Sequence, residues 1–382
     1  MSQSTIMQRL TLLTAVPVIA LIISSGLLIW DSFSRYQGAA QSKILMQLSV
    51  AAGEVIHPMQ VERGMTSGFL QSKGQEFADK LPGQREKTDA KLADFRQVIA
   101  GIDIRAMPQL KKVADELAGK LEKLSGTRER INQHAIPPGE AIGYFTATIS
   151  GLMEMMSTSA GLNKDPEIAR KLLIYHSFVN AKENAGQERA LTVAAFVANK
   201  VEPAQFRNIL KKVYAQENYL NTFQAAASEQ EKAALKAVLD GEGANEVRRM
   251  RGIIVDRSDS GGFNVDPPVW FKNSTAMING LHDVEQLLTK NINDNVNHVL
   301  FASRSALIMQ LLLAVVAMAI AIVVSIWVGR GVSKPLKAVV DAAEYAVAND
   351  DFSHNLPEEG TLTNLTPMVF PIIKSVVSNS VK

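Results

Sequence analysis

The segment QVERGMTSGFL, residues 60–70, places a charged glutamate–arginine pair inside an otherwise apolar helical pattern. A similar segment, GQERALTVAAF, follows at residues 186–196 and places Arg189 where the first segment places Arg63. In both segments two small residues follow the arginine one helical turn apart, namely Gly64 with Gly68 and Ala190 with Ala194. Small residues on one strip of a helix allow another backbone to approach closely, or leave room for a small ligand. The repetition therefore predicts a duplicated helical unit whose two copies each present an arginine at the edge of an interface.

The chain between residues 32 and 303 carries apolar residues at three- and four-residue spacing, which is typical of amphipathic helices. Proline and capping signals mark helix starts at Asp165–Pro166, at Pro203 and at the capping-box sequence of residues 228–231. We therefore predict an all-α fold. Long amphipathic helices joined by tight loops pack most often as antiparallel bundles. The repeat favours two antiparallel four-helix bundles, with a single elongated bundle as the alternative.

Two long runs lack charged residues, one at residues 10–30 and the other at residues 305–329. Each is long enough to cross a bilayer as a helix, which takes roughly 20 apolar residues. The first run is longer than the apolar region of a signal peptide and has no clear cleavage site, so we predict a retained anchor. Arg9 precedes the first run and Arg330 follows the second, which places both ends in the cytoplasm by the positive-inside rule.

These features predict a bitopic hairpin in the inner (cytoplasmic) membrane, in contact with membrane lipid. Its predicted parts are a cytoplasmic N-terminus at residues 1–9, a transmembrane helix at 10–30, a periplasmic helical domain at 31–303, a second transmembrane helix at 305–329 and a cytoplasmic segment at 330–382.

The residues that usually carry catalysis are sparse. The chain contains 0 cysteines, and its 6 histidines show no zinc-ligand spacing, which argues against thiolate chemistry and a zinc site. No phosphate-binding glycine loop and no nucleophile-elbow motif occur. A formal net charge of +2 argues against a nucleic-acid partner. We predict a protein that is not an enzyme and that needs no cofactor or metal.

Arg63 and Arg189 admit two interpretations. A guanidinium at a bundle interface offers planar, forked donors that match a planar oxyanion. A half-buried helical arginine also commonly pairs with a carboxylate of a neighbouring helix, and duplication would copy such a structural pair. The residue pattern by itself leaves both interpretations open.

Residues 45–300 resemble the nitrate- and nitrite-sensing (NIT) domain, on the segments HPMQVERGMTSGFL, YHSFVNAKENAGQERALTVAAF and VWFKNSTAMINGLHDVEQLL. The resemblance implies two four-helix bundles that hold nitrate or nitrite between them with arginines. It implies Arg63 and Arg189 as ligands, together with a third arginine from EVRRMRG, residues 246–252. The candidates there are Arg248, Arg249 and Arg251, of which Arg249 is favoured. The implied lining and neighbouring residues are Gly64, Ala190, Gln60 and His57.

Residues 330–360 resemble the first half of a HAMP linker, which implies a homodimer. The second half departs from that pattern because Pro367 and Pro371 lie within the expected helix. The layout resembles methyl-accepting chemotaxis receptors, but no signalling domain follows in the sequence. We therefore expect a transmembrane sensor with a cytoplasmic signalling partner. The alternative is an output-less membrane-anchored scaffold that senses no ligand.

Overall fold

The computed structural model describes residues 3–328 and residue 341. The chain divides into two compact units, one formed by residues 37–302 and the other by the residues on either side of them. The expected HAMP-like segment, with Pro367 and Pro371, lies outside the described residues except for Asp341.

The flanking unit contains the two apolar runs, and each belongs to a long helix. The first run lies in α1 (Gln3–Gln71) and the second in α10 (Pro267–Val328). Both helices are long and apolar enough to cross a membrane, with best mean hydropathies of 1.9 and 2.9. Large apolar side chains such as those of Leu27 and Leu312 are exposed in these runs. The two helices are compatible with the expected membrane hairpin.

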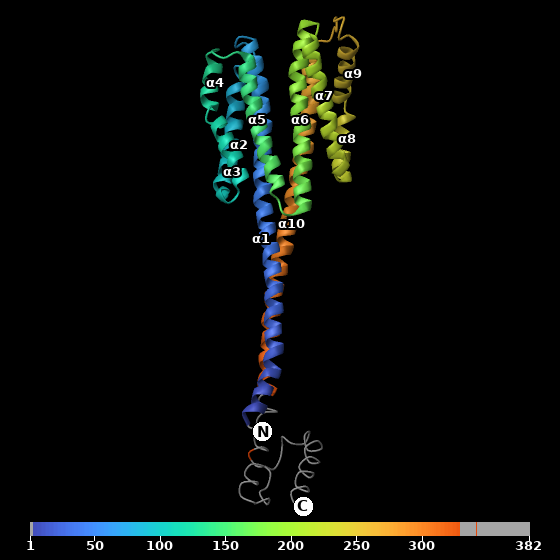
Figure 1. The fold of residues 1–382 in the computed structure, drawn as a ribbon. Coiled ribbons are helices and arrows are strands. Elements are labelled where there is room, and N and C mark those ends of the chain that lie inside the picture. The colour runs from blue at the N-terminus through green and yellow to red at the C-terminus, as the bar shows by residue number, and fades with distance from the viewer. Residues whose placement is uncertain (1–2, 329–340, 342–382) are drawn as a thin grey trace, which may run out of the picture. The chain divides into compact units, whose positions relative to one another are not determined.

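Residues 37–302 form a unit of packed helices, and the described residues contain no strand, which confirms the all-α prediction. After α1 come α2 (Leu81–Ala100), the 3-10 helix η1 (Ile104–Ala106), α3 (Pro108–Leu121), α4 (Leu124–Asn132) and α5 (Pro138–Gly161). These are followed by α6 (Pro166–Ala198), α7 (Pro203–Ala226), α8 (Glu229–Leu239), α9 (Glu242–Asp256) and α10. Figure 1 shows α2 to α5 gathered around α1, and α7 to α9 gathered around α6 and α10.

Local sequence signals explain where several of these helices begin. Asp165 caps α6, because its carboxylate accepts hydrogen bonds from the backbone N–H groups of Glu167 and Ile168, both at 3.0 Å. Ser228 and Glu231 form the expected capping box at the start of α8. Proline occupies one of the first two positions of α2, α3, α5, α6 and α7. There its fixed φ suits the helix and its missing N–H costs nothing.

The two halves of this unit repeat the same order of helices. The third helix of each half is interrupted, between α3 and α4 in the first half and between α8 and α9 in the second. The order α1, α2, α3 with α4, α5 thus corresponds to the order α6, α7, α8 with α9, α10. This arrangement is compatible with two four-helix bundles formed from a duplicated unit.

Apolar side chains fill the interior of each half. Phe145 and Met155 of α5 are fully buried, and so are Phe178 of α6, Phe223 of α7 and Trp270 of α10. Phe178 and Phe223 contact each other with ring centroids 4.9 Å apart. Ile56 and Met59 of α1 are also fully buried, so close packing positions both helices that carry the repeated arginines.

Candidate functional site

Arg63 lies on α1 at the contact with α6. Its side chain is buried, and Nη1 and Nη2 donate hydrogen bonds to the two carboxylate oxygens of Glu183 at 2.6 and 3.1 Å. Nη1 also donates to Thr146 Oγ1 of α5 at 2.9 Å. Arg63 therefore makes a forked ion pair with a carboxylate from the other half of the repeat.

Glu183 is the centre of a buried polar cluster. Besides Arg63, it accepts hydrogen bonds from Gln60 Nε2 at 2.7 Å and from Gln187 Nε2 at 2.6 Å. Each carboxylate oxygen thus accepts two hydrogen bonds, and all four donors come from α1 or α6. These four donors match the acceptor sites that the two oxygens of a carboxylate offer.

Arg189, the repeat partner of Arg63, has different neighbours. Nη1 donates to Thr275 Oγ1 of α10 at 2.8 Å, and the guanidinium lies over the Phe271 ring, 4.7 Å from its centroid. Within the part of the chain that the structure describes, Arg189 makes no ion pair with a carboxylate. Burial, and secondarily the positive charge of Arg63, lower the pKa of Arg189 to about 10. The Glu183 carboxylate raises this pKa in part, but it lies too far from Arg189 to form an ion pair, so Arg189 is charged at neutral pH without a directly paired carboxylate among the described residues.

The two arginines reach across the interface toward glycines of the opposite helix. Arg189 Nη2 lies 3.4 Å from the point that a Cβ atom on Gly64 would occupy. Arg63 Nη2 lies 3.4 Å from the corresponding point on Gly186. Each segment of the repeat thus supplies one arginine and one glycine, and the glycine of each segment lies beside the arginine of the other. A larger residue at either glycine would take up the space between them.

The glutamates of the repeat have a structural role. Arg128 of α4 donates to both oxygens of Glu62, each at 2.8 Å. Arg251 of α9 donates to both oxygens of Glu188, each at 2.5 Å. Both glutamates are buried, so these forked pairs tie α1 and α6 to the interrupted third helix of their own half.

The duplication therefore extends from the sequence to the contacts. Arg63 donates to Thr146 of α5, and Arg189 donates to Thr275 at the equivalent place in α10. The difference between the two halves is Glu183, which neutralises Arg63 and leaves Arg189 unpaired by a carboxylate among the described residues.

The structure brings together most of the residues expected at the site, but not all of them. Gln60 joins the Glu183 cluster, and Ala190 is exposed on α6 beside Arg189. Arg249 lies on the exposed side of α9, where it pairs with Glu246 at 2.9 Å, so the structure does not bring it to the other arginines. Arg248 is also exposed. Of the three candidate arginines on α9, Arg251 is the one that points toward α6.

His57 lies in a second buried polar group on α1, α6 and α10. Its ring stacks on that of His282 at 3.7 Å, and His282 Nδ1 lies 2.9 Å from Glu285 Oε2. Glu285 also pairs with the buried Lys182. Burial, followed by the positive charge of Lys182, lowers the pKa of His57 to about 3. The imidazole of His57 is therefore neutral at physiological pH.

Sequence reasoning missed Glu183, Gly186 and Thr275. A signal for Glu183 was present, because Lys182 and Glu183 follow the apolar residues Phe178, Val179 and Ala181 in a predicted helix. Thr275 offered no such signal, because it becomes significant only when α10 packs beside α6.

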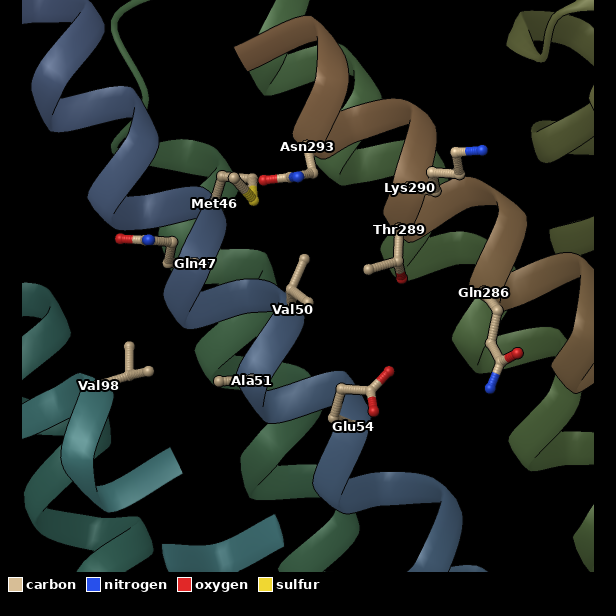
Figure 2. A pocket seen from close by; sticks show the side chains of 10 residues that line it. All are labelled: Met46, Gln47, Val50, Ala51, Glu54, Val98, Gln286, Thr289, Lys290 and Asn293. Carbon is tan, nitrogen blue, oxygen red and sulfur yellow. The ribbon is translucent and has the colours of Figure 1, made fainter. Parts of the chain in front are cut away.

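A groove between α1 and α10 is a separate feature (Figure 2). Glu54 and Lys290 are its charged lining residues, and Met46 and Val50 contribute apolar surface. No arginine lines this groove among the described residues. Without forked guanidinium donors it does not match a planar oxyanion as the Arg63–Arg189 interface does.

Comparison with known proteins gives one family and two relatives. A family model described as nitrate and nitrite sensing matches residues 54–293. The nitrate regulatory protein of Klebsiella oxytoca is 25% identical over 262 residues, which make up 68% of this chain and 66% of that protein. The chain therefore spans slightly less than two thirds of the length of this relative.

A solved structure, that of the NasR transcription antiterminator, is similar to this chain with a TM-score of 0.64. The similarity covers 84% of this chain and 89% of that chain at 20% sequence identity. At this identity the likeness establishes the fold alone.

Proposed function

The chain belongs to the nitrate- and nitrite-sensing family, and on that premise we propose that residues 37–302 bind nitrate or nitrite at Arg63 and Arg189. The observation that carries the proposal is Arg189, a charged guanidinium for which the described residues provide no carboxylate. An unpaired charge away from water is costly, and a small anion beside Arg189 removes that cost.

The chemistry of the ligand fits the interface between α1 and α6. Nitrate and nitrite are small, planar and singly charged, and the guanidinium donors match a planar oxyanion. Gly64 and Gly186 keep the space beside the two guanidinium groups free of side chains. Two or three hydrogen bonds to a charged group, each worth about 1.5–3 kcal/mol, are sufficient for micromolar affinity after the cost of ordering. In this proposal Gln60, Ala190 and His57 are neighbours, and Arg251 acts through Glu188.

The proposed function includes signal transmission across a membrane. In this proposal residues 10–30 and 305–329 are transmembrane helices, and residues 31–303 form a periplasmic domain. Residues 330–382 then form a HAMP-like cytoplasmic segment of a homodimer that engages a signalling partner. The long apolar stretches of α1 and α10 support this topology. Anion binding between α1 and α6 would favour one arrangement of these helices, and α1 continues into the first apolar run.

The name of the curated relative supports a regulatory role over an enzymatic one, because that relative is a nitrate regulatory protein. We propose that this chain shares anion sensing with its family and that its own output passes through the membrane.

The experiment is calorimetric titration of the full chain, solubilised in detergent in a chloride-free buffer, with sodium nitrate and sodium nitrite. Saturable binding that Arg189→Met abolishes would support the proposal. Absence of heat and of a thermal shift at millimolar nitrate and nitrite, from a protein with native helical content, would overturn it.

The second candidate function is a membrane-anchored scaffold without a ligand. The pairing of Arg63 with Glu183 favours it, because that pair satisfies one of the two arginines internally. The same titration separates the two candidates, since a scaffold would give no saturable heat with any anion.

A further inference from the structure

Glu183 differs from the other acidic residues of the interface in its position. Glu62 and Glu188 bind arginines within their own half of the repeat, whereas Glu183 of α6 binds Arg63 of α1 across the interface. Its carboxylate therefore lies beside the two guanidinium groups of the proposed anion site. A buried carboxylate at this place repels any incoming anion, which is an unexpected feature of an anion-binding site.

The charges in direct contact at the site sum to one positive charge. Arg63 and Arg189 contribute two positive charges and Glu183 contributes one negative charge. The next cation is the half-buried Lys212 of α7, which acts electrostatically on Glu183 and Arg63. Among the described residues Lys212 makes no ion pair with Glu183, so it adds a positive potential at longer range. Removal of Glu183 would raise the charge of the site by one.

We propose that Glu183 is a specificity-determining residue that restricts the site to singly charged anions by neutralising one of its two arginines. This inference rests on the proposed function. It adds an explanation of how the site excludes sulfate and other doubly charged oxyanions. The physical reason is that the repulsion between a fixed carboxylate and a bound anion is twice as large for a divalent anion as for a monovalent one. Glu183 therefore weakens the binding of sulfate more than the binding of nitrate.

The hydrogen bonds of Glu183 keep this charge in place. Four donors hold the carboxylate, two of them from Arg63 and one each from Gln60 and Gln187. Because every acceptor position is used, the Glu183 carboxylate cannot turn toward solvent without losing several hydrogen bonds. The two glutamines are neutral, so they fix the carboxylate without cancelling its charge.

The test is a series of charge variants of the full chain in detergent, titrated calorimetrically with sodium nitrate and with sodium sulfate in chloride-free buffer. Glu183→Gln keeps the shape of the side chain and raises the site charge by one. Glu183→Ala also raises the site charge by one and serves as the second variant. Glu246→Gln, which removes an exposed carboxylate paired with Arg249, is the matched control.

We expect Glu183→Gln to shift the ratio of sulfate to nitrate affinity toward sulfate by at least about tenfold. Glu183→Ala should shift the ratio in the same direction, and Glu246→Gln should leave both affinities within about twofold of the unaltered chain. If Glu183 served only to position Arg63, Glu183→Gln would weaken the binding of both anions equally and leave the ratio of their affinities unchanged.

The outcomes separate this inference from the proposed function. Suppose that the unaltered chain binds nitrate and that Glu183→Gln changes the ratio of sulfate to nitrate affinity by no more than about twofold. The proposed role of Glu183 is then overturned, while the proposed function stands. If the unaltered chain binds neither anion but Glu183→Gln binds sulfate, the charge-setting role is supported and the nitrate assignment is overturned. If no variant binds either anion, both are overturned. Should Glu183→Gln lose its helical content, the ratio of sulfate to nitrate affinity measured with Glu183→Ala decides, since that variant also removes the carboxylate.

Discussion

Arg189 places its Nη2 atom 3.4 Å from the point that a Cβ atom on Gly64 would occupy. The same relationship holds in reverse between Arg63 and Gly186. Two helices that each carry an arginine and accept the arginine of the other form an interface with a high density of positive charge. Glu183 offsets one of these charges, and the other makes no ion pair with a carboxylate of the described residues.

Gly64→Ala should stabilise the ligand-free protein and weaken anion binding. Alanine is favoured over glycine in a helix by about 1 kcal/mol, and a methyl group 3.4 Å from Arg189 Nη2 is a tolerable contact. The same methyl group takes up space beside the guanidinium, so we expect the affinity for nitrate to fall about tenfold. Thermal unfolding and calorimetric titration of the full chain measure the two effects.

Gly143→Ala is the matched control for that substitution. Gly143 lies within α5, and a Cβ atom there would meet nothing within 4 Å. Gly143→Ala should therefore raise stability with no change in affinity. Equal affinities for both alanine variants would show that the anion does not lie beside Gly64.

Arg189→Met and Arg251→Met should differ in their effects on stability. Arg189 has no carboxylate partner among the described residues, so its replacement should change the free energy of unfolding by less than about 1 kcal/mol. Arg251→Met leaves the buried Glu188 without its forked partner, and we expect a loss of about 3 kcal/mol. Urea unfolding measures both values. A larger loss for Arg189→Met than for Arg251→Met would identify Arg189 as a structural residue.

Acid should destabilise the protein in part through His57. Its pKa is lowered to about 3 in the folded state, by burial and then by Lys182, His282 and Arg189, and raised in part by Glu285. The unfolded chain takes up a proton near the ordinary histidine pKa of about 6.5 while the folded chain does not. Stability therefore falls as the pH falls from about 6.5 toward 3, by up to roughly 1.4 kcal/mol per pH unit for this group.

His57→Phe should flatten this pH dependence, because phenylalanine keeps the stack on His282 and takes up no proton. Urea unfolding between pH 4 and pH 7 measures the slope. His298→Gln alters an exposed histidine and serves as the control. An unchanged slope in His57→Phe would mean that another group causes the loss of stability in acid.

Trp270 should report anion binding through its fluorescence. Its Nε1 donates to the backbone oxygen of Arg189 at 3.0 Å, and the side chain is fully buried. In a chain that carries Trp30→Phe and Trp327→Phe, Trp270 is the single tryptophan, since the sequence contains 3. We expect a saturable change in its emission with nitrate that disappears in Arg189→Met. A change that grows linearly and equally in both proteins would indicate collisional quenching instead of binding.

Much of the fold was predictable from the sequence because its causes are local. The apolar spacing predicted helices throughout residues 32–303, and the capping box at residues 228–231 marked the start of α8. The repeated segments located Arg63, Arg189 and Gly64, since the spacing of these residues follows from the pitch of a helix.

Sequence reasoning did not identify which arginine of α9 points toward α6. Arg249 and Arg251 lie about 200° apart around α9, so only one of them can face α6. The buried residues of α9 are Ala244, Val247, Met250 and Ile254, and this apolar stripe indicates Arg251. The favoured residue, Arg249, lies on the exposed side.

The helical, duplicated character of the chain and its two flanking apolar helices were readable from the sequence, because periodicity and hydropathy are properties of neighbouring residues. The tertiary structure decided which arginine is neutralised. Arg63 and Arg189 have nearly identical local sequences, yet Glu183 pairs with Arg63, while Thr275 and Phe271 surround Arg189. A charge is balanced by groups that lie close in space, and packing of α1, α6 and α10 selects those groups from distant parts of the chain.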